Sequence, residues 1–274
     1  MIDWAGFYGY LSAGVVAAGL SLAILFALFA PMERAFPARQ TQPIFRAQWG
    51  LDLCFFLGQY LLWGGLVTYV LGLAAPMLST LLPIAWRTNV QALPAWLQGV
   101  LVVVISDFLV YWAHRLQHRV EFLWRFHRVH HSSEQLDWLA AHREHPLDTI
   151  YTVGTLNLPA IMLGFSVDFI LALVSFRAIW AIYIHSNVRL PLRPVRWLIG
   201  APELHHWHHD RERDAGNYAN LSPIMDILFG TYVCPDHEPE HLGLHEPSPR
   251  TYVGHMLQPL MPAKWWATLA ARGW

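Results

Sequence analysis

Apolar residues run almost without interruption through three long stretches in the first half of the chain. Residues 10–30 give 21 consecutive positions without a charged side chain. Residues 51–75 form a second stretch with Asp52 at its edge, and residues 95–113 form a third. A helix that crosses a bilayer needs about 20 apolar residues. Each stretch is therefore predicted to be one membrane-spanning helix.

A fourth apolar stretch, 147–184, is too long for one span at about 38 residues. Pro159 and Gly164 lie in its middle, where they favour a bend or a break in a helix. We therefore expect a hairpin of two short helices that returns to the side it left. The stretch also holds Asp168 and Arg177, and a fold that joins these two charges across the hairpin would account for both.

The composition supports a membrane protein. Hydrophobic residues make up 55% of the chain and charged residues only 14%, whereas soluble domains carry about 25% charged residues. The net charge of −1 and the lack of a long basic run give no support for nucleic-acid binding. The two cysteines, Cys54 and Cys234, form no paired motif, so neither a disulfide scaffold nor a cysteine metal site is expected.

The basic residues of the loops predict the orientation, because short cytoplasmic loops are rich in Lys and Arg. Arg34, Arg39 and Arg46 follow the first span, whereas the loop 76–94 carries only Arg87. The first loop is therefore predicted to be cytoplasmic and the N-terminus to lie outside. The third span then exits into the cytoplasm, and the hairpin returns the chain to the same face.

Histidines cluster on that predicted cytoplasmic face. Twelve of the 16 histidines fall between residues 114 and 209. Two of the clusters share the spacing H-x-x-H-H, and residues at i, i+3 and i+4 lie on one face of a helix. Imidazole is the commonest side-chain ligand of transition metals, so the repeated spacing predicts metal binding. The three clusters are His114 and His118; His127, His130 and His131; and His205, His208 and His209.

The remaining histidines need separate interpretations. We favour His145, just before Pro146, over His142 as a residue that faces the clusters, and His185 ends the second helix of the hairpin. His206 interrupts the third cluster and is expected to contact the ligands or the substrate rather than the metal. The four later histidines, in a region rich in Pro and Gly, are expected to be solvated: His237, His241, His245 and His255.

Ten histidines remain as candidate metal ligands, which is too many for one ion. They suggest two ions with roughly five ligands each, and sites rich in nitrogen with an open position suit iron better than structural zinc. Zinc or nickel can replace iron in a purified sample, because the order of affinities does not favour ferrous iron. The candidates are His114, His118, His127, His130, His131, His145, His185, His205, His208 and His209.

These motifs resemble the fatty acid hydroxylase / sterol desaturase superfamily of membrane-bound di-iron oxygenases. The resemblance lies in DFLVYWAHRLQH (107–118), LWRFHRVHHSS (123–133), REHPLD (143–148), IHSN (184–187) and PELHHWHHD (202–210), and it continues through NYANLSPIMDILFGTYV (217–233). It implies two irons, O2 as co-substrate, and hydroxylation or desaturation of an unactivated C–H bond in a lipid such as a fatty acyl chain or a sterol. The resemblance supports the clustered histidines and His185 directly and supports His145 less directly.

The expected protein is an all-α polytopic membrane helical bundle of about three full spans plus a helical hairpin, with a cytoplasmic histidine-rich metal site. We expect one integral-membrane domain over 1–274, with spans and loops in 1–100, the catalytic region in 101–233 and a cytoplasmic tail in 234–274. No haem, iron–sulfur or Gly-rich flavin or nicotinamide motif occurs, so electrons must come from an external donor such as a cytochrome, ferredoxin or reductase.

Carboxylates near the clusters could accept from the outer N–H groups of ligand histidines. Helix caps and surface ion pairs are equally good interpretations of them. Arginines among the clusters could bind a lipid phosphate or an acidic electron donor, although cytoplasmic topology alone accounts for them. A zinc hydrolase is disfavoured because no H-E-x-x-H motif occurs, and a metal transporter because its ionisable residues would lie near mid-bilayer. The carboxylates are Asp107, Asp148, Glu203, Asp210, Asp214 and Asp226, and the arginines are Arg115, Arg119, Arg125, Arg128 and Arg143.

Overall fold

A computed structural model describes residues 4–165, 167–191, 193–262, 265–266 and 268. These residues form helices and loops and contain no β-strand, only two isolated bridges that pair Pro37 with Val188 and Asp210 with Leu242. The prediction of an all-α fold is confirmed. The α-helices are α1 (Trp4–Ala35), α2 (Trp49–Gly58), α3 (Gly64–Ser79), α4 (Ile84–Gln91), α5 (Ala95–Arg119), α6 (Glu121–His127), α7 (Pro146–Leu163), α8 (Val167–His185), α9 (Pro202–His208), α10 (Ile224–Leu228) and α11 (Tyr252–Leu257). The short turns are the π-helical η1 (Gln59–Trp63) and the 3-10 helices η2 (His130–Ser132), η3 (Ala140–His142), η4 (Arg193–Val195) and η5 (Gln258–Leu260).

Four helical segments of the described chain are long and apolar enough to cross a membrane: Ser12–Ala35, Trp49–Ser79, Ala95–Arg119 and Asp168–His185. The helices that hold the first three segments contain the three predicted spans, although the first predicted span begins two residues before Ser12. Their outer faces expose large apolar side chains such as Ile24, Leu66 and Val104. Exposed apolar surface on this scale is expected of helices that face lipid.

The predicted hairpin is formed by α7 and α8, which pack against each other. The helix continues past residue 159 and ends at Leu163, and Gly164 makes the turn with a φ of 83°. A side chain is strained in this left-handed conformation, so glycine is the residue that suits it. The two helices have 18 and 19 residues, and at 1.5 Å per residue they are close to full-span length rather than short.

The expected pairing of Asp168 with Arg177 is wrong. Arg177 is buried and donates to Asp107 on α5 at 3.0 Å, whereas Asp168 is exposed at the start of α8. The two residues lie on the same helix, so their side chains cannot meet across the hairpin. The ion pair with Asp107 instead ties α8 to the third span.

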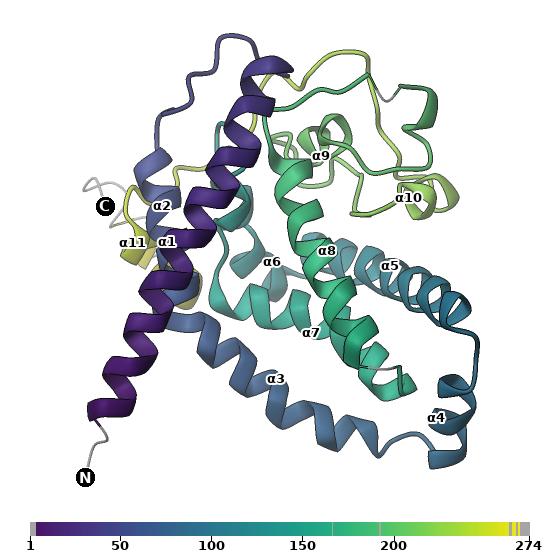
Figure 1. Ribbon diagram of the computed structural model, residues 1–274. Helices are drawn as coiled ribbons and strands as arrows, with labels where there is room; N and C mark the ends of the chain where they lie inside the picture. The colour runs from purple at the N-terminus through teal and green to yellow at the C-terminus, as the bar shows by residue number, and fades with distance from the viewer. Residues whose placement is uncertain (1–3, 166, 192, 263–264, 267, 269–274) are drawn as a thin grey trace.

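The packing of the helices brings the histidine-rich segments to one end of the bundle (Figure 1). α8 runs from the turn at Gly164 to α9, with which it is in contact, and α5 leads directly into α6. In Figure 1, α9 and α10 lie at the end of the molecule opposite the N-terminal end of α1. Segments that are 90 residues apart in sequence, such as the ends of α5 and α9, are therefore neighbours in space.

The second span is interrupted by the π-helical turn η1. The wider turn lets the N–H of Gly64 bond to the carbonyl of Gln59, and a Cβ on residue 64 would lie 2.3 Å from that oxygen. Single π-helical turns are frequent at functional sites. Here the turn places the side chain of Gln59 beside His142, and the Nδ1 of His142 lies 2.9 Å from the amide oxygen of Gln59.

A buried ionic network connects the second span to the segment between the second histidine cluster and α7. Asp52 accepts from Arg46 and from Arg143, each at 2.5 Å, and Arg46 also donates to Asp137 at 2.7 Å. All four side chains are at most 3% exposed. Buried ion pairs contribute little net free energy, but breaking one leaves an uncompensated charge in a dry interior.

The C-terminal region folds back onto the bundle. The ring of Tyr252 packs on Phe55 of α2 with 5.0 Å between ring centroids, and its hydroxyl lies 3.2 Å from the indole nitrogen of Trp63. The expectation that His255 is solvated is wrong, because this ring is fully buried against Phe55. Burial lowers the pKa of His255 to about 3. The three other histidines of this region are exposed, as expected: His237, His241 and His245.

We predict that Asp52→Ala lowers the free energy of unfolding by about 3–5 kcal/mol, because it leaves the buried guanidinium of Arg143 without its carboxylate. The measurement is the thermal unfolding of the detergent-solubilised protein, followed by circular dichroism. Glu240→Ala is the control, since that carboxylate is 89% exposed. Equal shifts of the two unfolding midpoints would show that the network does not hold these segments together.

Candidate metal centre

Nine histidines converge where α5, α6, α8 and α9 meet. Their ligand nitrogens form two groups, and within each group the nitrogens lie within 4.8 Å of one another. Eight of the nine rings are buried, and His114 is partly buried. The first group is His114, His118, His127, His131 and His208, and the second is His130, His185, His205 and His209.

The two groups are interleaved along the sequence. In the second cluster, His127 and His131 belong to the first group and His130 to the second. This split is possible because α6 ends at His127 and the chain continues as the 3-10 turn η2, so the spacing does not form one continuous helical face. In the third cluster, His208 belongs to the first group and His205 to the second. Each H-x-x-H-H segment therefore contributes to both groups.

The outer nitrogen of most of these rings is fixed by a main-chain carbonyl. The Nδ1 of His114 donates to the carbonyl of Tyr218 at 2.8 Å, and that of His208 donates to the carbonyl of Gly216 at 2.8 Å. A neutral imidazole with a proton on Nδ1 has its lone pair on Nε2. The Nε2 atoms therefore face the interior of each group as acceptors. The same contact is made by His118 to Arg213 at 2.5 Å, His130 to Arg143 at 3.2 Å and His185 to Ala181 at 2.6 Å.

The inward nitrogens fit a cation better than they fit one another. The Nε2 atom of His185 lies 2.9 Å from that of His205 and 3.3 Å from that of His209, and these last two are 3.1 Å apart. Hydrogen bonds alone cannot satisfy this triangle, because a neutral ring has one N–H and His185 donates its own to Ala181. In the first group the Nε2 atoms of His118, His131 and His208 are buried without a hydrogen-bond partner. A metal ion at the centre of each group would satisfy all of these lone pairs.

Burial keeps the ligand rings in the form that binds metal. It lowers the pKa of His130, His205 and His209 well below the usual value for histidine, and the neighbouring imidazoles lower it further. The pKa values of His127, His131 and His208 are lowered in the same way. The rings are therefore neutral near pH 7, and only a neutral imidazole has a lone pair for a metal.

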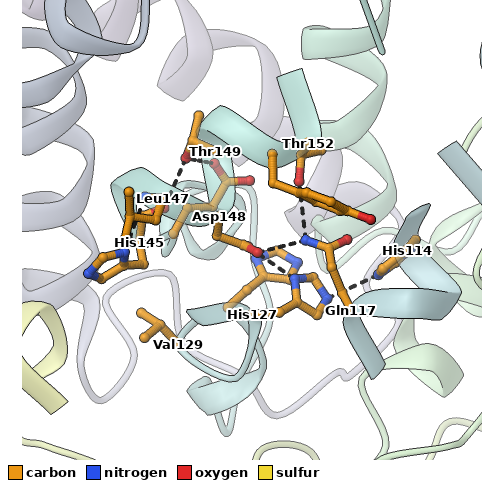
Figure 2. A network of polar contacts seen from close by, with 12 residues as sticks. His114, Gln117, His127, Val129, His145, Leu147, Asp148, Thr149 and Thr152 are labelled. Carbon is orange, nitrogen blue, oxygen red and sulfur yellow. Dashed lines mark hydrogen bonds and ion pairs between the residues drawn. The ribbon is translucent and has the colours of Figure 1, made fainter. Parts of the chain in front are cut away.

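One ligand is held by a carboxylate. The Nδ1 of His127 lies 3.0 Å from Asp148, whose other oxygen accepts from the amide of Gln117 at 2.6 Å (Figure 2). A carboxylate in this position orients the ring and strengthens it as a ligand. Asp148 thus makes the contact that was one of the two interpretations open from the sequence, whereas nothing in the sequence singled out Gln117.

Asp226 supports the ring of His114 indirectly, through the main chain of a loop. It accepts from the main-chain N–H groups of Tyr218 and Ala219 at 2.8 and 2.9 Å, and so holds the loop whose carbonyl binds His114. The other candidate carboxylates bond elsewhere. Asp107 pairs with Arg177, Glu203 lies 3.7 Å from Arg189, Asp214 pairs with Arg119, and Asp210 accepts from the N–H of Glu212.

Three of the histidines considered from the sequence lie outside both groups. His145 caps α7, where its Nδ1 accepts from the N–H of Leu147 at 3.2 Å, and its Nε2 lies 3.3 Å from the carbonyl of Met256. Figure 2 shows its ring apart from His114 and His127, on the other side of Asp148. Both nitrogens thus have main-chain partners, and His145 lies outside the two groups of histidines. His206 is bound on both sides, by Glu238 at 2.6 Å and by the carbonyl of Ser186 at 3.1 Å. His142 is held by Gln59, and burial lowers its pKa to about 4.

A cavity of about 390 Å³ opens beside the two groups. Its walls include His114 and His127 from the first group and His130, His185 and His205 from the second. The rest of the wall comes from η1, α3, α5, α7 and α8, with apolar side chains such as Val67, Val153 and Leu156. The carboxyl of Glu144 also lines the cavity, and burial raises its pKa to about 7. A molecule in this cavity would meet both groups of histidines at once.

We predict that Asp148→Ala lowers the affinity for metal by about 10–100-fold, the usual cost of losing a carboxylate behind a ligand histidine. The affinity can be measured by competition with a chromophoric chelator. Asp214→Ala is the control, since Asp214 is 45% exposed and paired with a surface arginine. Equal affinities of the two variants would contradict a role for Asp148 in holding His127.

A second prediction concerns whether His145 is needed for metal binding. His145→Ala should retain the full metal content, because both nitrogens of this ring bond to the main chain. His130→Ala should lower the affinity for metal by more than about tenfold. Elemental analysis of the two purified variants decides the point, and loss of metal from His145→Ala would return that residue to the ligand set.

The region that holds the histidine groups is similar to known proteins. A model of the fatty acid hydroxylase family matches residues 99–231. The chain is 35% identical over 144 residues to an ornithine lipid hydroxylase of Rhizobium tropici and 32% identical over 143 residues to an alkylglycerol monooxygenase of Xenopus tropicalis, in each case over 52% of the chain. It is 31% identical to a Delta(7)-sterol 5(6)-desaturase of Gibberella zeae over 50% of the chain.

The matched segments span 44%, 31% and 38% of the lengths of these three relatives, respectively, so the chain corresponds to less than half of each. No solved structure matches the chain. The matched residues include every histidine of the two groups and the cavity wall formed by α5, α7 and α8. Residues 99–231 are thus similar to the fatty acid hydroxylase family, and the relatives that match about half of the chain include a hydroxylase and a sterol desaturase.

Proposed function

We propose that this protein is an integral-membrane di-iron oxygenase that uses O2 and external electrons to hydroxylate an unactivated C–H bond of a lipid. The observation that carries the proposal is the convergence of two groups of neutral imidazoles on one cavity among apolar helices. The relatives named above support the reaction class, since they are a lipid hydroxylase, a monooxygenase and a sterol desaturase.

The nine histidines are the proposed ligands of two ions. Five nitrogens in one group and four in the other leave room for an open coordination position. Sites rich in imidazole suit iron, and an open position is what a metal needs in order to react. Two bound irons would supply the activation of O2 and the oxidising power that breaks a C–H bond.

The residues of the chain bind and orient the reactants. Carbonyl groups and Asp148 fix the ligand rings, so little rearrangement is needed when the metals react. The apolar side chains of α3, α5, α7 and α8 form a slot that a lipid can enter from the bilayer, and they exclude water from the reacting carbon. The cavity contacts both groups, so the reacting C–H bond can lie between them.

Desaturation is the second candidate outcome, because one relative is a sterol desaturase. Hydroxylation and desaturation begin with removal of the same hydrogen and differ in whether a second hydrogen is removed. The depth at which the cavity walls hold the substrate would decide between them. We favour hydroxylation because the other two relatives are a hydroxylase and a monooxygenase.

We further propose that the N-terminus lies outside, that the metal site faces the cytoplasm, and that an external cytochrome, ferredoxin or reductase supplies the electrons. The arginines of the first loop, Arg34, Arg39 and Arg46, support this orientation. The whole chain would then form one integral-membrane domain, with the catalytic region in 101–233 and the segment after residue 233 packed against its cytoplasmic end.

The test begins with metal. Detergent-purified protein should contain about two iron ions per chain by elemental analysis and Mössbauer spectroscopy. The double variant His130→Ala, His208→Ala should lose them, because it removes one ligand from each group. His237→Ala is the matched control, since this histidine is exposed and lies outside both groups. With lipid extract, reductant and 18O2, the iron-loaded protein should yield a product that carries the label.

Two results would contradict the proposal. One tightly held zinc that survives reconstitution with ferrous iron would exclude the di-iron reaction. A protein that holds iron but consumes no O2 with any lipid fraction would exclude an oxygenase. A product that is two hydrogens lighter and unlabelled would favour the desaturase.

A further inference from the structure

Trp124 lies directly against the first group of histidines. Its ring centroid is 5.1 Å from that of His118, 5.4 Å from that of His131 and 6.3 Å from that of His127. The side chain is on α6 and is 8% exposed. Among the ring contacts of the described residues, this is the one tryptophan that touches a proposed ligand.

The buried indole of Trp124 lies beneath a side chain that reaches the protein surface. The guanidinium carbon of Arg213 lies 4.7 Å from the centre of the indole ring, and the Arg213 side chain is 33% exposed. Arg213 also pairs with Glu121, which is 74% exposed and lies one helical turn before Trp124 on α6. The indole thus packs against both the proposed ligand rings and a residue of a charged surface that a partner can approach.

The loop that carries Arg213 is fixed to the same ligand. The Arg213 side chain donates to the main-chain carbonyl of His118 at 2.5 Å, and the Nδ1 of His118 bonds to the carbonyl of Arg213. The stack of Arg213, Trp124 and His118 is therefore held in one arrangement. Electron tunnelling weakens steeply as the gap between donor and acceptor widens, so a rigid, closely packed aromatic ring provides a favoured route.

The proposed reaction needs such a route. Hydroxylation by O2 consumes two electrons from outside, since one oxygen atom enters the product and the other leaves as water with two protons. The sequence carries no haem, iron–sulfur or flavin motif, and the two cysteines are unpaired. The electrons must therefore cross the protein from the surface to the metals.

We propose that Trp124 is the residue through which electrons enter the metal centre, from a one-electron carrier protein that docks over Arg213 and Glu121. In each transfer the carrier is oxidised by one electron and one metal ion is reduced by one electron, twice in each turnover. The indole is a tunnelling bridge, so it neither gains nor loses a proton. This inference rests on the proposed function.

The experiment measures reduction rather than turnover. Iron-loaded, oxidised protein is mixed under nitrogen with a reduced plant-type [2Fe–2S] ferredoxin, and oxidation of the ferredoxin is followed by its absorbance. Trp124→Leu should slow this reduction at least tenfold, whereas Trp124→Phe, which keeps an aromatic ring, should retain part of the rate. Trp207→Leu is the matched control and should retain the wild-type rate, since Trp207 lies on α9 against His237 rather than against a proposed ligand.

Reduction by dithionite separates this role from a structural one. Dithionite needs no docked carrier, so its rate should be the same in all four proteins, with unchanged iron content and Mössbauer spectra. Equal ferredoxin rates in wild type and Trp124→Leu would overturn the route. Equal losses with ferredoxin and dithionite would also overturn it, because Trp124 would then only support the ligands. A wild-type protein that neither reductant reduces would overturn the proposed function together with the route.

Discussion

Nine imidazoles face one another in a dry interior, where a cation in each group would satisfy lone pairs that hydrogen bonds leave unpaired, and most of the surrounding structure serves to hold these rings in place. Burial keeps the rings neutral, while carbonyl groups from three separate segments and the carboxylate of Asp148 fix their outer nitrogens. Metal bound by these histidines, as proposed, would therefore contribute its binding free energy to the folding of this end of the bundle.

The ion pairs of Asp52 connect the first hundred residues of the chain with the histidine groups. The side chain of Arg143 pairs with Asp52, and its main-chain carbonyl accepts a hydrogen bond from the Nδ1–H of His130. The second span and a ligand of the second group are thus joined through a single residue. This connection explains why an ion pair of little net stabilising value is useful here, since it fixes the position of a main-chain acceptor.

The sequence predicted the parts of this structure that depend on local patterns. The three spans, the hairpin and the three histidine clusters all follow from apolar length or from helical spacing. The division of the ligands into two groups could not be predicted, because it depends on the end of α6 at His127 and on the contact of α8 with α9.

The differences between the expected and the observed contacts share a physical cause. His145 looks like a ligand in sequence, but the main chain around α7 and α11 satisfies both of its nitrogens. Arg177 pairs with α5 rather than within its own hairpin, and His255 is buried because the C-terminal region folds back. Each error depends on a contact between residues distant in sequence, which no local pattern encodes.

The interleaving of the two groups has a consequence for how the centre assembles. Because the segment 127–131 contributes histidines to both groups, the first of the two proposed ions would order the backbone that the second ion needs. Binding of the two ions should then be cooperative, so a population of chains short of metal would divide into empty and fully loaded molecules, with few that hold one ion. A centre built in this way cannot be reduced to two separate mononuclear halves.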